Sequence, residues 1–528
     1  MSPSLDLFPL LSNAISPAPS SALVTASTQV LRASNAVAQV GAPVTETQSA
    51  VVEPMSLGAL FAVFGVLAML AYAAAYLIRP VHLALGFATT AAMWSIGFVS
   101  MMAPGLWIGE ALFALTVGVP VIFGAIAQRA GASPVKTGLV SALANLLVIG
   151  AFLRDEQGGA SWVPVAYVGG LFIASAALAA FGGFLARRAK PITLPTPASL
   201  FARVAAVTVF ILLVTGGLVT GLESGLAVPD WPNSFGHNML LYPISEMKGG
   251  IYYEHAHRLF GMLVGVTALV LVNVVFRDER RSPLPRTLSV LFLAMVCVQG
   301  LFGGLRVTGT LTSAVSGAEL SPSTLLAIVH GMFGQIVFAT ACVIACVTSR
   351  MWSEGRAFSA LRDAGRLRAL PVMLVAAMLV QLFLGASYRH LQIPPSDGNP
   401  AVHPAWPIWG HIFGAFVVLI LAVITGAHAS SRAGEIRPIR FFGKALVHGV
   451  GLQFALGIAA LVVVLIRTDA RIPVYEVATT SAHQALGALL LASAAMLAAW
   501  SLRLVASPAT GAADAIPSSS TPRVAARH

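Results

Sequence analysis

The sequence predicts an all-α polytopic membrane protein with about 13 transmembrane helices, the last eight of which form two pseudo-repeated four-helix bundles. Hydrophobic residues make up 57% of the 528 positions and charged residues only 10%, and the mean hydropathy is +0.84. Because soluble domains contain about 25% charged residues, this composition favours a chain that lies in a lipid bilayer. A span needs roughly 20 apolar residues, and about 13 such stretches can be marked.

The predicted spans fall into two groups. Five occupy a membrane block at 55–190 whose function the sequence does not reveal, near 57–77, 81–104, 108–127, 137–153 and 162–186. A basic, Pro- and Thr-rich segment precedes eight more, near 201–221, 253–276, 285–305, 323–348, 369–388, 405–428, 441–466 and 475–503. We assign these eight to one half at 200–347 and another at 348–505. The polar, Ser- and Pro-rich ends, 1–54 and 506–528, are predicted to be a disordered leader and tail.

Basic residues in the loops predict the orientation. Arginines crowd the loops near 277–286, 350–368 and 432–440, whereas the intervening loops contain few bases. By the positive-inside rule, the arginine-rich loops are cytoplasmic. We therefore predict a multi-pass protein of the bacterial cytoplasmic (inner) membrane. The net charge of +11 is spread over short loops and forms no basic face, so we expect no nucleic-acid partner.

Four histidines recur along the second group of spans, each near the start of a long apolar stretch and each followed by a glycine. They are His257, His330, His411 and His483, at intervals of 73, 81 and 72 residues. Imidazole is costly inside a bilayer and is retained there mainly for function. A single such histidine is usually structural, but the near-equal first and last intervals indicate a duplicated pair of axial heme ligands. The predicted positions place the iron sites toward the outer face.

A second repeat runs in phase with the histidines. Gln299, Gln381 and Gln453 each precede a glycine by four positions and lie 31, 30 and 30 residues before the next histidine of the series. Glycine lets helices approach closely in lipid, and it could leave room for a flat macrocycle.

Charged groups near the histidines are candidates for chemistry. Glu254 stands one turn before His257, whereas the matching position before His411 is Ile408. Glu254 is therefore the candidate catalytic residue, although an ion pair with Arg258 would give it a structural role. Four arginines are candidates for binding heme propionates, or for interfacial snorkelling: Arg258, Arg306, Arg389 and Arg467.

These residues resemble the heme A synthase family over about residues 200–505. The likeness rests on the loop at 225–232, on the Glu254-x-x-His257-Arg258 motif, and on the three later histidines. It implies that heme O, the substrate, lies between His257 and His330, and that heme b lies between His411 and His483. The implied reaction oxidises a heme methyl group to formyl and yields heme A for terminal oxidases, with Glu254 essential. Some members carry a cysteine pair in the first outer loop, which has none here.

Two other classes remain open. A diheme b-type membrane electron carrier would need the same four histidines but no carboxylate beside a substrate, and a non-catalytic assembly factor could hold heme without converting it. Glu254 and the loop at 225–232 favour the enzyme. Besides heme O, heme A and the lipid bilayer, the candidate partners are heme O synthase, terminal oxidase assembly proteins and a second copy of the chain.

Overall fold

The computed structural model describes residues 57–102, 106–155, 162–279, 282–309, 324–355, 363–392, 402–467 and 472–506. The predicted leader and almost all of the predicted tail lie outside these residues. In the described part of the chain, 12 helices are long and apolar enough to cross a membrane, and α2 (Leu57–Leu77) is a further apolar helix. The prediction of an all-α polytopic membrane protein is confirmed.

The helices of the first group lie close to their predicted bounds. After α2 they are α3 (Pro80–Met101), α4 (Trp107–Arg129), α5 (Pro134–Asp155) and α6 (Val163–Leu185). Helices α4 and α6 approach closely because small residues meet there: a Cβ at Gly124 would collide with Ala179, and one at Gly182 with Val121. Such contacts between small residues are a common basis of helix association in lipid.

The second group contains eight long helices. They are α7 (Pro197–Gly221), α8 (Gly249–Asp278), α9 (Pro283–Thr308), α10 (Thr324–Val347), α12 (Ala364–His390), α13 (Ala405–Arg432), α14 (Arg437–Leu465) and α15 (Val474–Leu504), with the short α11 (Arg350–Glu354) between α10 and α12. Two of them, α7 and α9, begin at a proline, which suits the first turn because its missing N–H has no partner there. Helix α7 is also capped by Thr196, whose Oγ1 accepts a hydrogen bond from the Ser199 N–H.

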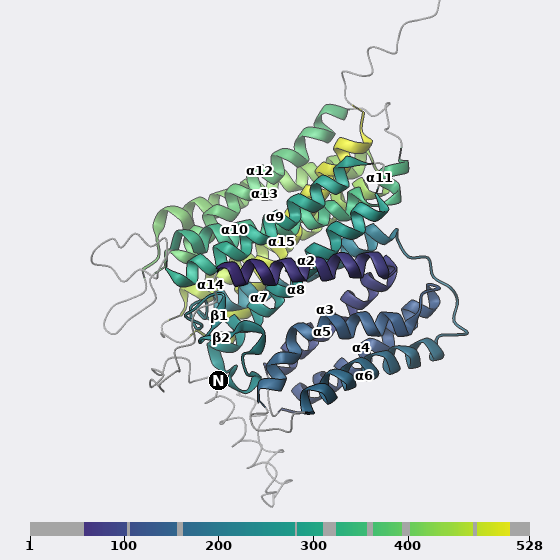
Figure 1. Ribbon diagram of the computed structural model, residues 1–528. Coiled ribbons are helices and arrows are strands. Elements are labelled where there is room, and N and C mark those ends of the chain that lie inside the picture. The colour runs from purple at the N-terminus through teal and green to yellow at the C-terminus, as the bar shows by residue number, and fades with distance from the viewer. Residues whose placement is uncertain are drawn as a thin grey trace, which may run out of the picture. The chain divides into compact units, whose positions relative to one another are not determined.

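The eight helices pack in two sets of four. Figure 1 shows the long helices of this group with roughly parallel axes. Helices α7 to α10 contact one another around the first set, and α12 to α15 do so around the second. The sets meet where α10 packs on α12 and α15, and where α7 packs on α15. Because consecutive spans alternate in direction, the four helices that carry the histidines run the same way. Each histidine lies within the first ten residues of its helix, so all four are near the same membrane face.

A compact loop joins α7 to α8. It contains a two-residue hairpin of β1 (Asn233–Ser234) and β2 (His237–Asn238), then the short helices η1 (Met239–Leu241) and η2 (Ile244–Glu246). The hairpin turn is formed by Phe235 and Gly236, whose φ angles are 51° and 75°. Two positive φ angles match the turn type that suits a two-residue hairpin. The carboxylate of Asp230 fixes this turn by accepting hydrogen bonds from both N–H groups, at 2.7 and 2.8 Å.

Candidate functional site

The four histidines form two facing pairs. The ring centroids of His257 on α8 and His330 on α10 lie 6.4 Å apart with an interplanar angle of 78°. Those of His411 on α13 and His483 on α15 lie 6.3 Å apart at 73°. A metal bound to two imidazoles at about 2 Å would place the ring centroids roughly 6.3 Å apart. Both pairs therefore fit an iron atom between them.

The donor set also fits heme rather than an ion held by protein ligands alone. Within the described residues, no group of three or more His, Cys, Asp or Glu side chains could hold a metal. A porphyrin supplies four ligands of its own, so two axial imidazoles suffice. The three cysteines are free, and none belongs to such a group.

Each imidazole lies against a glycine of the preceding helix. A Cβ added at Gly216, Gly303, Gly385 or Gly457 would come within 2.8 to 3.1 Å of the Cε1 atom of His257, His330, His411 or His483, respectively. Real Cβ atoms rarely approach a neighbour so closely, so any larger residue would displace the ring. The glycines of the glutamine repeat thus make room for the histidine rings, which is why they recur in phase with them.

The glutamines of the repeat hold the backbone of the histidines. The side-chain amides of Gln299, Gln381 and Gln453 donate to the carbonyl oxygens of His330, His411 and His483, at 2.9, 2.8 and 3.0 Å. Each glutamine therefore ties a ligand-bearing helix to its neighbour at the level of the ligand. Nδ1 of His411 also lies 3.1 Å from the carbonyl oxygen of Gln381. A hydrogen bond there leaves Nε2 free to bind a metal.

His257 lacks this glutamine contact. The residue four positions before Gly216 is Leu212, which has no amide to donate. Instead, Oγ1 of Thr215 lies 3.1 Å from Nδ1 of His257. The first pair is therefore built differently from the second, although the two ring geometries agree closely.

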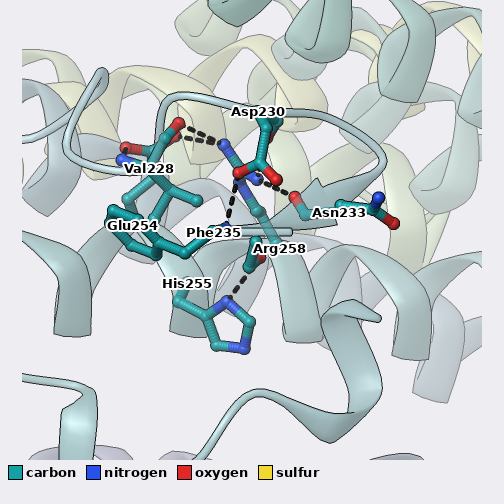
Figure 2. A network of polar contacts seen from close by, with 8 residues as sticks. Val228, Asp230, Asn233, Phe235, Glu254, His255 and Arg258 are labelled. Carbon is teal, nitrogen blue, oxygen red and sulfur yellow. Dashed lines mark hydrogen bonds and ion pairs between the residues drawn. The ribbon is translucent and has the colours of Figure 1, made fainter. Parts of the chain in front are cut away.

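Glu254 and Arg258 form a buried ion pair that fastens α8 to the loop at 228–236 (Figure 2). Arg258 Nη2 lies 2.7 Å from Glu254 Oε1, and Glu254 Oε2 accepts a hydrogen bond from the Val228 N–H at 2.8 Å. Arg258 also donates to the carbonyl oxygens of Val228, Asp230 and Asn233. The Glu254 side chain is 5% exposed, and both carboxylate oxygens have protein partners. The structural ion pair considered for Glu254 thus exists.

The same loop packs against α9 beside the first histidine pair. The Trp231 ring of this loop lies against Gly304, which follows Gly303, the glycine in contact with the His330 ring. The guanidinium of Arg306, near the end of α9, lies against Gly225 of the loop. Arg306 is also within electrostatic range of His257, His330 and Glu254. The loop, Arg306 and the first pair therefore form one site.

The other two candidate arginines belong to a cluster that joins the two helix sets. Arg389 Nη2 donates to the carbonyl oxygen of Thr220 at 2.6 Å, and its Nη1 lies 3.8 Å from Glu223 Oε1. Arg467 Nε lies 3.3 Å from Glu476 Oε2, with each side chain 6% exposed. In the described part of the chain, Nη1 of Arg467 is buried without a hydrogen-bond partner. That orphaned donor fits an anionic group such as a heme propionate.

Sequence reasoning missed Glu476. Comparison of Glu254 with Ile408 indicated that only the first site has a carboxylate. The structure shows a buried carboxylate in the second helix set as well, that of Glu476 on α15. Glu476 precedes His483 by seven residues, which separates the two by about 10 Å along the helix axis. Glu254 precedes His257 by three residues, which corresponds to only about 4.5 Å. A glutamate in the first turn of an apolar span was the available signal.

Two further histidines are placed by the structure. Nδ1 of His255 lies 3.1 Å from Ser234 Oγ in the hairpin, and the His255 side chain is fully buried. His390 is the last residue of α12. From there it is within electrostatic range of Arg306 and His330.

Facing histidine pairs in an all-helical membrane bundle define a membrane protein of the heme-related class. The chain belongs to the cytochrome oxidase assembly protein family, whose model matches residues 199–495.

Relatives in the comparison are named heme A synthase. One from Listeria monocytogenes serotype 4a is 28% identical over 145 residues, which cover 28% of this chain and 42% of that protein. One from a Bradyrhizobium species is 26% identical over 307 residues, 48% of this chain and 80% of the relative. One from a Caulobacter species is 25% identical over 358 residues, which cover 58% of this chain and 96% of that relative. The chain thus matches less than half the length of the Listeria relative.

Proposed function

We propose that this chain is a heme A synthase, an oxidoreductase that converts a methyl group of heme O to the formyl group of heme A. The observation that carries the proposal is that two histidine pairs have the same ring geometry but different surroundings. Beside one pair lies a loop that is fastened to α8 through Glu254 and Arg258. Equal ligation with unequal surroundings suits one site that converts its heme and another that keeps it.

The first pair is the substrate site in this proposal. Heme O would lie between His257 and His330, beneath the loop that contains Trp231. Arg306 is the propionate-binding candidate there, because its charge acts electrostatically on both histidines. Arg258 keeps Glu254 and the loop in place, since both of its terminal nitrogens have protein acceptors.

The second pair, His411 and His483, would hold heme b, with Arg467 toward its propionates. A bound heme b supplies one-electron redox chemistry to the protein. Gln381 and Gln453 hold the backbone of its two ligands, and Gly385 and Gly457 fix where their rings lie. These contacts suit a resident cofactor whose ligands should not move.

Glu254 is the catalytic candidate. Oxidation of a methyl group releases protons, and a carboxylate near the reacting carbon can accept one or stabilise positive charge that develops there. In the described residues its two oxygens contact Arg258 and Val228, so this role requires one of those contacts to loosen when substrate binds.

A diheme electron carrier is the second candidate function. The ring separations, 6.4 and 6.3 Å, are compatible with it because a carrier needs two hemes that are each held by two axial ligands. It gives no reason for the loop and the buried Glu254 beside only one of them.

Pigment analysis after co-expression tests the proposal. The chain is produced with a heme O synthase in a host that makes no heme A, and the extracted hemes are separated by chromatography. We expect heme A in the membranes, and heme b together with heme O or heme A in the purified protein. Cells with His330→Ala are the matched control and should accumulate heme O. Heme b alone in the wild-type protein would identify an electron carrier, and bound heme O without heme A would identify a heme-holding assembly factor.

A further inference from the structure

We propose that the N-terminal membrane block, α2 to α6, is a positioning element that holds helix α8 and thereby orients His257. The proposal uses the substrate-site assignment made above only to name the site that is affected. The extensive contacts of this block with the rest of the described chain are with α7, α8 and the helices η1 and η2 of the loop. These elements all belong to the first site.

One stripe of α8 carries the contact. Tyr252, Ala256 and Phe260 are four residues apart and share a face of the helix, which packs on α3. The Tyr252 hydroxyl donates to the carbonyl oxygen of Phe98 at 2.6 Å, and the two rings stack with centroids 5.3 Å apart. Phe260 meets the rings of Phe98 and Trp94 edge-on. The Trp94 ring is itself held, because its Nε1 donates to Asn145 Oδ1 of α5 at 2.7 Å.

The ends of α8 are also in contact with the block. Near its C-terminal end, Arg277 Nη1 donates to the carbonyl oxygens of Ala75 and Tyr76 in α2, at 2.7 and 3.2 Å. Near the loop, Gly150 of α5 lies directly against the backbone of Leu240 in η1. The block therefore restrains α8 along its length, together with the loop that Arg258 fastens to it.

The second half of the chain provides an internal comparison. Tyr252 precedes His257 by five residues, and Trp406 precedes His411 by five. Tyr252 is 7% exposed because α3 covers it, whereas Trp406 is 56% exposed. His411, like His330 and His483, is held by a glutamine amide, and His257 is the ligand without one. The block thus holds the one ligand helix that lacks the glutamine contact.

The geometry makes the orientation of α8 decisive for ligation. His257 follows Ala256 on the helix, so its side chain projects about 100° from the stripe that packs on α3. A rotation of α8 by about 20° would move an imidazole roughly 6 Å from the helix axis by roughly 2 Å, as much as a metal–nitrogen bond length. Loss of the α3 contact should therefore tilt or withdraw His257 from the iron and leave the other pair unchanged.

Hemin binding to the purified full-length protein tests this inference. Hemin is titrated to both sites, and the ferric low-spin signals are recorded by electron paramagnetic resonance, which is sensitive to the angle between the two axial imidazole planes. The variants His330→Ala and His483→Ala assign each signal to its site. In Tyr252→Leu we expect a shifted first-site signal and roughly tenfold weaker hemin binding there, with the second-site signal unchanged. Tyr252→Phe, which keeps the ring and loses the hydroxyl, should give a smaller shift in the same direction.

Trp406→Leu is the matched control and should change neither signal. An unchanged first-site signal in both Tyr252 variants would overturn the proposal, as would equal changes at both sites, which indicate general destabilisation. Because the readout is hemin ligation, it does not depend on heme A formation. Heme A content, measured separately in cells, reports on the proposed function, so the two can fail independently.

Discussion

Glu254 and Arg258, one turn apart on α8, form a 2.7 Å ion pair that is enclosed by the backbone of the loop between α7 and α8. Arg258 donates to three carbonyl oxygens of this loop, and Glu254 accepts one of its N–H groups. The ion pair therefore fixes the loop on α8, the helix that carries His257. A residue with such contacts can be structural, catalytic or both, and substitution distinguishes these roles.

Glu254→Gln should abolish heme A formation without unfolding the protein. Glutamine keeps the shape and can still accept the Val228 N–H, while Arg258 retains its three carbonyl acceptors. We expect normal expression, bound heme b and heme O, and little or no heme A by chromatography of extracted pigments. Glu435→Gln is the comparison, since it changes an exposed glutamate between α13 and α14 and should spare heme A formation. Loss of all heme and of folded protein in Glu254→Gln would indicate a purely structural pair, and normal heme A content would exclude Glu254 from the reaction.

His411→Ala and His483→Ala should each remove the stable heme b spectrum, because a bis-imidazole site then loses one axial ligand. Reduced-minus-oxidised difference spectra of the purified variants measure this. His428→Ala changes a histidine near the opposite end of α13 and should leave the spectrum intact. Full low-spin heme b in both ligand variants would show that the second pair is not the heme b site.

Gly385→Ala should weaken heme b binding by at least about tenfold. The new Cβ would lie 2.8 Å from Cε1 of His411, so the ring must shift. A hemin titration of the purified protein gives the affinity. Gly451→Ala on the adjacent helix α14 is a matched control, because nothing lies within 4 Å of its Cβ position. There the change should be neutral or stabilising by up to about 1 kcal/mol through helix propensity. Equal affinities in the two variants would contradict the role given to the glycine.

The variant Ser282→Cys is made in a chain whose three native cysteines have been replaced by serine. The new cysteine should not react with an impermeant thiol reagent in intact cells, because its loop is predicted to be cytoplasmic. Asn238→Cys, exposed in the loop between α7 and α8, should react. Labelling is measured by gel shift, with permeabilised cells as the positive control. Reaction at Ser282 but not at Asn238 would reverse the orientation and place the histidine pairs toward the cytoplasm.

Much of the protein could be predicted from local sequence. Long apolar stretches make spans because an unpaired backbone polar group is costly in lipid, so the long helices α2 to α10 and α12 to α15 lie close to their predicted bounds. The spacing of His257, His330, His411 and His483 indicated duplicated pairs, and their facing rings agree with that pattern. Likewise, the glutamine and glycine repeat could be recognised in the sequence, because each glutamine lies 30 or 31 residues before a ligand histidine.

Only the tertiary structure decided how these helices meet. Nothing in the sequence places Glu476 beside Arg467, or Tyr252 beneath Phe98, because such contacts join residues on different spans. In lipid, apolar faces gain little from burial against one another, so packing depends on small residues and a few hydrogen bonds that hydropathy does not register. The membrane spans, the spacing of the histidines and the type of ligand are local properties and could be predicted from the sequence. The partners of Glu254 and the helices that pack on α8 depend instead on how side chains from distant segments fit together.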